Sequence, residues 1–134
     1  MSDAGRERFE LREPAAVAEI DLGPIIDAAV LIPTARPLSP FPPVSRDVNI
    51  VVPEATRWDE VESLARTAGG ELVESIAYRE TYRDAVRLGG DRKSLLFSLQ
   101  LRSATGTMTN EEADAVRDGI VALLGKQLGG ELRA

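Results

Sequence analysis

The stretch SLLFSLQLRS, residues 94–103, decides how this chain folds. Apolar residues recur at every second position, which predicts a β-strand with one buried face and one polar face. The predicted buried face holds Leu95, Phe97, Leu99 and Leu101. The predicted opposite face holds Leu96, Ser98, Gln100 and Arg102.

Two further strands are predicted before this one. Residues 46–52 alternate in the same way, with Val48, Ile50 and Val52 on one side, and Pro53 closes the strand. Residues 71–83 predict a long strand whose phase the pattern does not fix, because a β-bulge fits it. Residues 84–93 are polar and contain glycine, which predicts a flexible loop, and residues 131–134 predict a short final strand.

Two helices are predicted between these strands. The first begins at Thr56, whose hydroxyl is expected to cap it, and ends at Gly69-Gly70. Its apolar face is expected to hold Trp58, Val61, Leu64, Ala65 and Ala68. The second begins at the capping box of residues 109–112 and ends at Gly129-Gly130. Its apolar face is expected to hold Ala113, Val116, Ile120 and Leu123.

The order strand, helix, strand, strand, helix, strand predicts the fold class. It is an α+β, ferredoxin-like split βαβ sandwich with a four-stranded antiparallel sheet, to which an N-terminal extended segment is added. Each helix has a single apolar stripe, so both are expected on the same face of the sheet. The other face is then left to solvent or to a partner.

The first 43 residues have a different pattern. Residues 17–22 alternate like a strand, Gly23-Pro24 interrupts them, and a second apolar stretch runs from Ile25 to Ile32. Five prolines between residues 33 and 43 predict an extended linker. A lone strand has no sheet of its own, so we expect residues 1–43 to be an N-terminal segment and linker from a preceding domain. Residues 44–134 are then the folded domain.

Composition lowers the expectation of an enzyme. The chain has 134 residues with no cysteine and no histidine, which removes disulfides, thiol nucleophiles and the usual zinc ligands. We therefore expect no catalytic residue, no metal and no cofactor in this piece. No apolar run approaches the ~20 residues of a membrane span, and the charged N-terminus does not resemble a secretory signal. These features predict a cytoplasmic protein.

Charge is unevenly distributed along the chain. The net charge is −6, yet residues 79–102 contain six basic and three acidic side chains. A local basic stretch on an acidic body can bind a phosphate backbone while the acidic remainder disfavours indiscriminate binding. Residues 89–94 superficially suggest a phosphate loop, but Arg92 stands where that motif needs glycine before its lysine.

Several short motifs in register resemble one family. FPPVSRD, residues 41–47, is similar to the Phe-Pro-x-Val-x-Arg-Asp start of the ferredoxin-fold anticodon-binding domain (FDX-ACB) of bacterial phenylalanyl-tRNA synthetase beta chains. The later matches are Tyr82-Arg83, Lys93-Ser94-Leu95, Arg102-Ser103 and the capping motif at 107–112. The resemblance covers about residues 14–134. Asp84 and Gly106 depart from the family pattern, as does the loop between residues 84 and 92.

The resemblance implies a non-catalytic module that binds the anticodon region of tRNA(Phe). Within a class II phenylalanine–tRNA ligase it would position tRNA for aminoacylation by the alpha subunit. ATP and magnesium belong to that parent enzyme, and the expected partners are tRNA(Phe) and the rest of an alpha2-beta2 assembly. Self-association of the isolated chain through Val17–Ile32 is a further expectation. Two alternatives are a ferredoxin-like regulatory domain that binds a small molecule and a protein-docking module.

Alternation and resemblance together predict the RNA contacts. The expected residues are Arg46, Asn49, Arg83, Lys93, Ser98, Gln100 and Arg102. For Arg46 a structural role, in which Arg46 and Asp47 pair or cap locally at the start of the strand and hold the linker in place, is favoured over a phosphate contact that Asp47 orients. The open face is expected to lack aromatic residues, so arginine stacking and hydrogen bonds would bind the bases.

Overall fold

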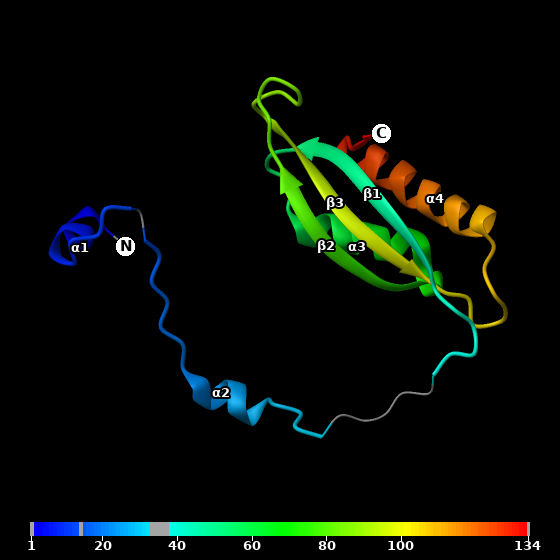
Figure 1. Ribbon diagram of the computed structural model, residues 1–134, viewed down its shortest axis with the longest axis horizontal. Coiled ribbons are helices and arrows are strands. Elements are labelled where there is room, and N and C mark those ends of the chain that lie inside the picture. The colour runs from blue at the N-terminus through cyan, green and yellow to red at the C-terminus, as the bar shows by residue number, and fades with distance from the viewer. Residues whose placement is uncertain (1, 14, 33–37, 134) are drawn as a thin grey trace. The chain divides into compact units, whose positions relative to one another are not determined.

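A computed structural model describes residues 2–13, 15–32 and 38–133 of the chain (Figure 1). The chain divides into two compact units, residues 1–37 and residues 38–134. No helix among the described residues has the length and apolar character needed to cross a membrane.

The N-terminal unit contains two short helices. Helix α1 is Asp3–Arg8, and helix α2 is Leu22–Asp27. The prediction of a strand at residues 17–22 is wrong. Asp21 instead caps α2, because its side chain accepts a hydrogen bond from the Gly23 amide at 2.9 Å. Pro24 lies in the first turn of α2, where a helix does not need the missing N–H. The segment is therefore not wholly extended, and the part of the predicted linker at residues 33–37 lies outside the described residues.

The larger unit is built on one antiparallel sheet. Its strands are β1 (Val44–Pro53), β2 (Val73–Tyr82), β3 (Arg92–Leu101) and β4 (Glu131–Leu132). The spatial order is β2-β3-β1-β4, and β1 pairs with β3 along its whole length, from Val44 opposite Leu101 to Pro53 opposite Arg92. This confirms the predicted ferredoxin-like arrangement, with β1 and β3 in the centre.

The helices of this unit are α3 (Trp58–Gly69), followed by a 3-10 turn η1 (Gly70–Leu72), and α4 (Asn110–Leu128). Helix α4 begins as predicted, with the Thr109 hydroxyl accepting from the Glu112 amide and the Glu112 carboxylate accepting from the Thr109 amide. The N-cap residue of α3 is Arg57 instead of Thr56, and Glu60 accepts a hydrogen bond from the Arg57 amide at 2.8 Å.

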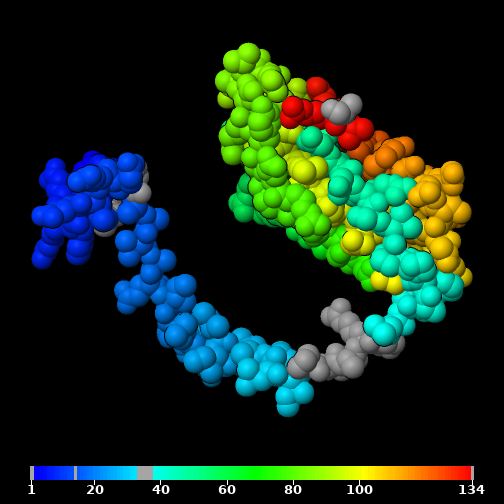
Figure 2. All heavy atoms as spheres, in the orientation of Figure 1, coloured from blue at the N-terminus to red at the C-terminus, as the bar shows by residue number. Residues whose placement is uncertain are grey.

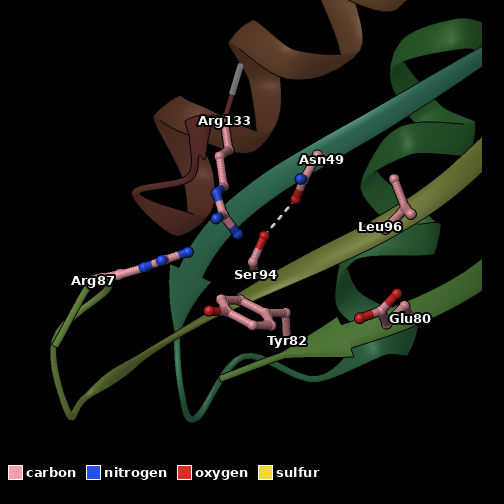
Figure 3. A pocket seen from close by; sticks show the side chains of 7 residues that line it. All are labelled: Asn49, Glu80, Tyr82, Arg87, Ser94, Leu96 and Arg133. Atoms are coloured by element: carbon pink, nitrogen blue, oxygen red, sulfur yellow. Dashed lines mark hydrogen bonds between the residues drawn. The ribbon is translucent and has the colours of Figure 1, made fainter. Parts of the chain in front are cut away.

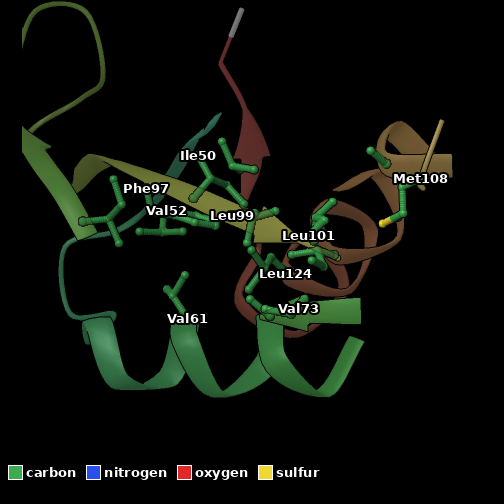
Figure 4. Packing of buried hydrophobic residues seen from close by; sticks show 14 residues of the cluster. Ile50, Val52, Val61, Val73, Phe97, Leu99, Leu101, Met108 and Leu124 are labelled. Carbon is green, nitrogen blue, oxygen red and sulfur yellow. The ribbon is translucent and has the colours of Figure 1, made fainter. Parts of the chain in front are cut away.

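Both helices cover the same face of the sheet (Figures 1 and 4). Their buried positions pack on the alternate residues of β1 and β3 that the sequence placed inward. Fully buried side chains at the centre are Val48, Ile50, Val52, Val61, Phe97, Leu99, Leu101, Ile120 and Leu124. Leu124 takes the place predicted for Leu123, because positions 113, 120 and 124 follow one stripe of α4.

Candidate nucleic-acid interface

The sheet face opposite the helices is polar and uncovered. Figure 2 shows this side, with β1, β2 and β3 exposed next to one another. We call it the open face. It carries the side chains of Asp47, Asn49, Ser75, Ala77, Glu80, Tyr82, Ser94, Leu96, Ser98 and Gln100.

Asn49, Ser98 and Gln100 lie on the open face, where the alternation predicted them. Ser98 is only 4% exposed, because its hydroxyl donates to Asp47 Oδ1 at 2.6 Å and accepts from Arg79 Nε at 2.9 Å. Asn49 Oδ1 accepts a hydrogen bond from the Ser94 hydroxyl, which leaves its amide N–H groups available to a ligand.

Arg46 does not belong to this face. It lies opposite Leu99, in phase with the core, and reaches the start of α4. There its Nε donates to Asp114 Oδ1 at 2.8 Å and its Nη2 donates to Asn110 Oδ1 at 2.9 Å. The predicted pairing with Asp47 is therefore wrong, since Asp47 points to the other face. Arg46 holds the pKa of Asp114 below its usual value, mainly through this hydrogen bond.

Arg83 and Lys93 both bind Glu54, the residue after β1. Arg83 forms a forked pair with the Glu54 carboxylate, with Nη2 at 2.7 Å and Nε at 3.0 Å. Lys93 Nζ donates to the Glu54 carbonyl at 2.7 Å, and its side chain is 11% exposed. The hydrogen bond from Arg83 lowers the pKa of Glu54.

Arg102 also has partners within the fold. It pairs with Glu74 at 3.0 Å and donates to the carbonyl of Phe41, so it ties the end of β3 to β2 and to the approach to β1. All four predicted cations are thus bound to acceptors of the chain itself, and the seven predicted residues do not form one surface.

Tyr82 supplies the aromatic ring that the open face was expected to lack. The register of β2 against β3 shifts between Tyr78 and Glu80, which leaves Arg79 as an extra residue. Tyr78 therefore lies opposite Phe97 on the helix side, whereas Tyr82 lies opposite Ser94 on the open face. One bulge thus sends two tyrosines four positions apart to opposite faces.

A pocket of about 260 Å³ surrounds Tyr82 (Figure 3). We call it the tyrosine pocket. Its lining residues are Asn49, Glu80, Tyr82, Arg87, Ser94, Leu96 and Arg133. The guanidinium carbon of Arg133 lies 5.0 Å from the centroid of the Tyr82 ring, within the range of a cation–π contact.

Asp84 holds the Tyr82 hydroxyl and the loop that follows it in position beside the tyrosine pocket. Its carboxylate accepts from the Tyr82 hydroxyl at 2.7 Å and from the amides of Val86 and Arg87 at 2.9 and 3.0 Å. The bond from Tyr82 lowers the pKa of Asp84 and raises the pKa of Tyr82. The departure from the family pattern at Asp84 therefore builds a turn that positions both the ring and Arg87.

Arg87 and Arg133 line this pocket, and Arg79 lies on the open face with its Nε bound to the Ser98 hydroxyl. Among the described residues, Arg79 and Arg133 have no carboxylate within ion-pair distance, and the Nε of Arg87 is 3.7 Å from Asp84 Oδ2. These three arginines and Tyr82 were not predicted from the sequence as RNA contacts. Arg79 and Arg87 belong to the basic stretch at residues 79–102, but the phase of β2 at Arg79 and the turn that holds Arg87 could not be predicted.

Comparison with known proteins gives matches over most of the chain. Residues 39–133 match the family model described as the ferredoxin-fold anticodon binding domain. The phenylalanine–tRNA ligase beta subunit of Rhodopirellula baltica is 35% identical over 91% of this chain and 18% of its own length. That of Nocardia farcinica is 38% identical over 95% of this chain and 15% of its own length. The chain thus spans less than a fifth of the length of these relatives.

Proposed function

The chain belongs to the ferredoxin-fold anticodon-binding domain family, and from this premise we propose that its open face binds the anticodon loop of tRNA(Phe). The relatives that it matches are phenylalanine–tRNA ligase beta subunits, which suggests the same parent protein here. The chain is then a binding module with no catalytic residue of its own.

One observation carries this proposal: the tyrosine pocket combines an aromatic ring, hydrogen-bonding groups and two arginines, of which Arg87 has only a 3.7 Å contact with Asp84 and Arg133 lies over the ring. Unpaired RNA bases stack on aromatic rings and on guanidinium planes, and their edges form hydrogen bonds. Asn49 can donate to a base edge, and Glu80 can accept from one. A base-paired stem offers no free base of this kind, so the pocket favours a loop.

The proposal divides the seven residues of the sequence analysis into three groups. Asn49 and Gln100 remain proposed RNA contacts, with Arg79 and Arg133 supplying the charge, whereas Ser98 is buried and its hydroxyl is already bonded to Asp47 and Arg79, so it positions these side chains. The other four residues, Arg46, Arg83, Lys93 and Arg102, act indirectly by holding the fold that presents the open face.

In the proposed parent enzyme this module positions tRNA for aminoacylation by the alpha subunit. The chemistry, with ATP and magnesium, belongs to that class II enzyme, an alpha2-beta2 assembly of the cytoplasm. Residues 1–43 would join the module to the preceding part of the beta subunit. Their exposed apolar side chains, among them Val30, Leu31 and Ile32, suit such a neighbour.

Titration of the chain with a fluorescent anticodon stem–loop of tRNA(Phe) tests the proposal. We expect binding that weakens as salt rises, because phosphate contacts release counterions. The control RNA has the same stem closed by a short tetraloop in place of the anticodon loop, and it should bind more weakly. Equal binding of both RNAs, or no binding at low salt, would contradict the proposal. A thermal shift with free amino acids but not with RNA would favour a regulatory domain.

A further inference from the structure

A second pocket adjoins the tyrosine pocket at the edge of the sheet. Its volume is about 370 Å³, and we call it the edge pocket. The lining residues are Val51, Arg87, Leu88, Arg92, Glu131, Leu132 and Arg133. Arg87 and Arg133 also line the tyrosine pocket, so these two arginines stand between the two cavities.

The third arginine of the edge pocket is already bound. Arg92 Nη1 donates to Glu131 Oε1 at 3.0 Å, and its Nη2 donates to the carbonyls of Val51 and Gly129. Arg92 therefore holds β4 in place and keeps Glu131 neutralised. Among the described residues, Arg133 has no carboxylate within ion-pair distance, and Arg87 has only the 3.7 Å ion pair with Asp84.

The backbone fixes both arginines in this position. The amide of Arg133 donates to the carbonyl of Asn49 at 2.8 Å, which continues the pairing of β4 with β1. The amide of Arg87 is held by Asp84, as described above. Figure 3 shows the two side chains entering the tyrosine pocket from different segments, Arg87 from the β2–β3 loop and Arg133 from the C-terminal end.

We propose that Arg87 and Arg133 together bind a single phosphodiester, with one nucleotide in the tyrosine pocket and the adjacent nucleotide in the edge pocket. This inference rests on the proposed RNA-binding function. The two cavities share Arg87 and Arg133, while Arg92 in the edge pocket is paired with Glu131, and this arrangement matches two nucleosides joined by one negative linkage. Leu88, Val51 and Leu132 supply the apolar part of an edge pocket whose lining is otherwise mostly polar, which suits the mixed surface of a nucleoside. The RNA strand then crosses the sheet edge between the β2–β3 loop and the C-terminal end.

A linkage scan tests this assignment. A set of anticodon stem–loops carries one uncharged methylphosphonate each, at successive positions of the loop, and binding to the full chain is measured by anisotropy. We expect one position to lose about tenfold in affinity, because it removes the charge between the two arginines. In the double variant Arg87→Gln/Arg133→Gln, the unmodified RNA should bind equally weakly. The methylphosphonate at that position should then have no further effect.

Salt dependence gives a second readout. If one phosphate is shared, the slope of log affinity against log salt should fall by about 0.7 in the double variant. A fall of about 1.4 would show two separate phosphates and would overturn the shared site. Arg66→Gln is the matched control, because Arg66 is paired with Glu62 on α3, and it should change nothing. Melting curves of all variants verify that the fold is intact.

The outcomes separate this inference from the function on which it rests. If the chain binds the stem–loop and Tyr82→Ala weakens binding, the proposed function stands. The shared phosphodiester alone is then rejected in either of two cases. In the first, no methylphosphonate position lowers the affinity of the wild-type chain. In the second, the same position lowers the affinity of the double variant as much as that of the wild type. If the wild-type chain does not bind the stem–loop at any salt concentration, both proposals are wrong.

Discussion

Asp84 joins the ring of the tyrosine pocket to the loop that carries Arg87. Its three hydrogen bonds reach the Tyr82 hydroxyl and the amides of Val86 and Arg87, so one carboxylate sets the position of both groups. At the scale of single residues, the tyrosine pocket depends on few side chains. Tyr82 offers a surface for stacking, Asp84 orients it, and Arg133 lies over the ring.

Replacement of Tyr82 separates stacking from orientation. We expect Tyr82→Ala to weaken binding of the anticodon stem–loop by about 1–3 kcal/mol, the usual contribution of one stacked base. Tyr82→Phe should keep most of the affinity, because it loses the hydroxyl but not the ring. Anisotropy titrations measure both, with melting curves as the control. If Tyr82→Phe lowers the affinity as much as Tyr82→Ala does, the hydroxyl and its hydrogen bond to Asp84 contribute more to binding than the ring.

Asp114 predicts a pH dependence of stability. Its pKa is lowered in the folded chain, first by the hydrogen bond from Arg46, so folding favours its charged form. Its contribution is therefore present above the unfolded pKa, about 3.9, and is lost as pH falls through the lower folded value. The melting temperature of wild type should exceed that of Asp114→Asn at pH 6, and the gap should shrink towards pH 2.5. A gap that is independent of pH would contradict this.

At the scale of elements, the strands and helices could be predicted where the pattern is local. The alternation of β3 and the capping box of α4 are complete within about ten residues, and the structure confirms both. The position of Arg46 could not be predicted, because its partner Asp114 lies 68 residues further along the chain. The face of Tyr82 could not be predicted either, since alternation does not show where β2 gains its extra residue.

Two glycines in helices should respond in opposite ways to alanine. At Gly69, an added Cβ would lie 2.2 Å from the Cγ2 of Val73, a stiff and buried neighbour. We expect Gly69→Ala to destabilise the fold by about 1–3 kcal/mol through overpacking. Gly119 in α4 has no atom within 4 Å of such a Cβ, so Gly119→Ala should stabilise by about 0.5–1 kcal/mol. Urea unfolding measures both, and a stabilising Gly69→Ala would show that the end of α3 relaxes freely.

At the scale of the whole molecule, the stability of the chain resides in one unit. All residues of the hydrophobic core fall between Val48 and Leu124, and the residues packed around them extend only to Val44 and Leu128. In residues 1–37 the described large apolar side chains are exposed, including Val17, Ile20 and Ile26. The acidic net charge is likewise a property of the whole chain, whereas the candidate site uses a local excess of arginine.

We therefore expect residues 38–134 alone to fold and unfold cooperatively, with a melting temperature within a few degrees of the full chain. The shorter chain keeps Phe41, whose carbonyl binds Arg102. Residues 1–37 alone should show no cooperative transition, because a stable fold needs buried apolar surface. Circular dichroism and calorimetry on the two pieces measure this. A shorter chain that fails to fold would show that the core needs the N-terminal segment.

The long pairing of β1 with β3 has a consequence for the order of folding. Strands β2 and β3 are joined by the loop at residues 83–91 and can form a hairpin early. The pairing of Val44 with Leu101, in contrast, closes a much longer segment of the chain. Such distant pairing is slow, because loop closure costs entropy before any contact forms. Asn49 lies on β1, and Arg133 follows the strand that pairs with β1, so the tyrosine pocket is complete only after the slow step. RNA should then slow unfolding without accelerating refolding, and a refolding rate that rises with RNA concentration would show that the pocket forms earlier.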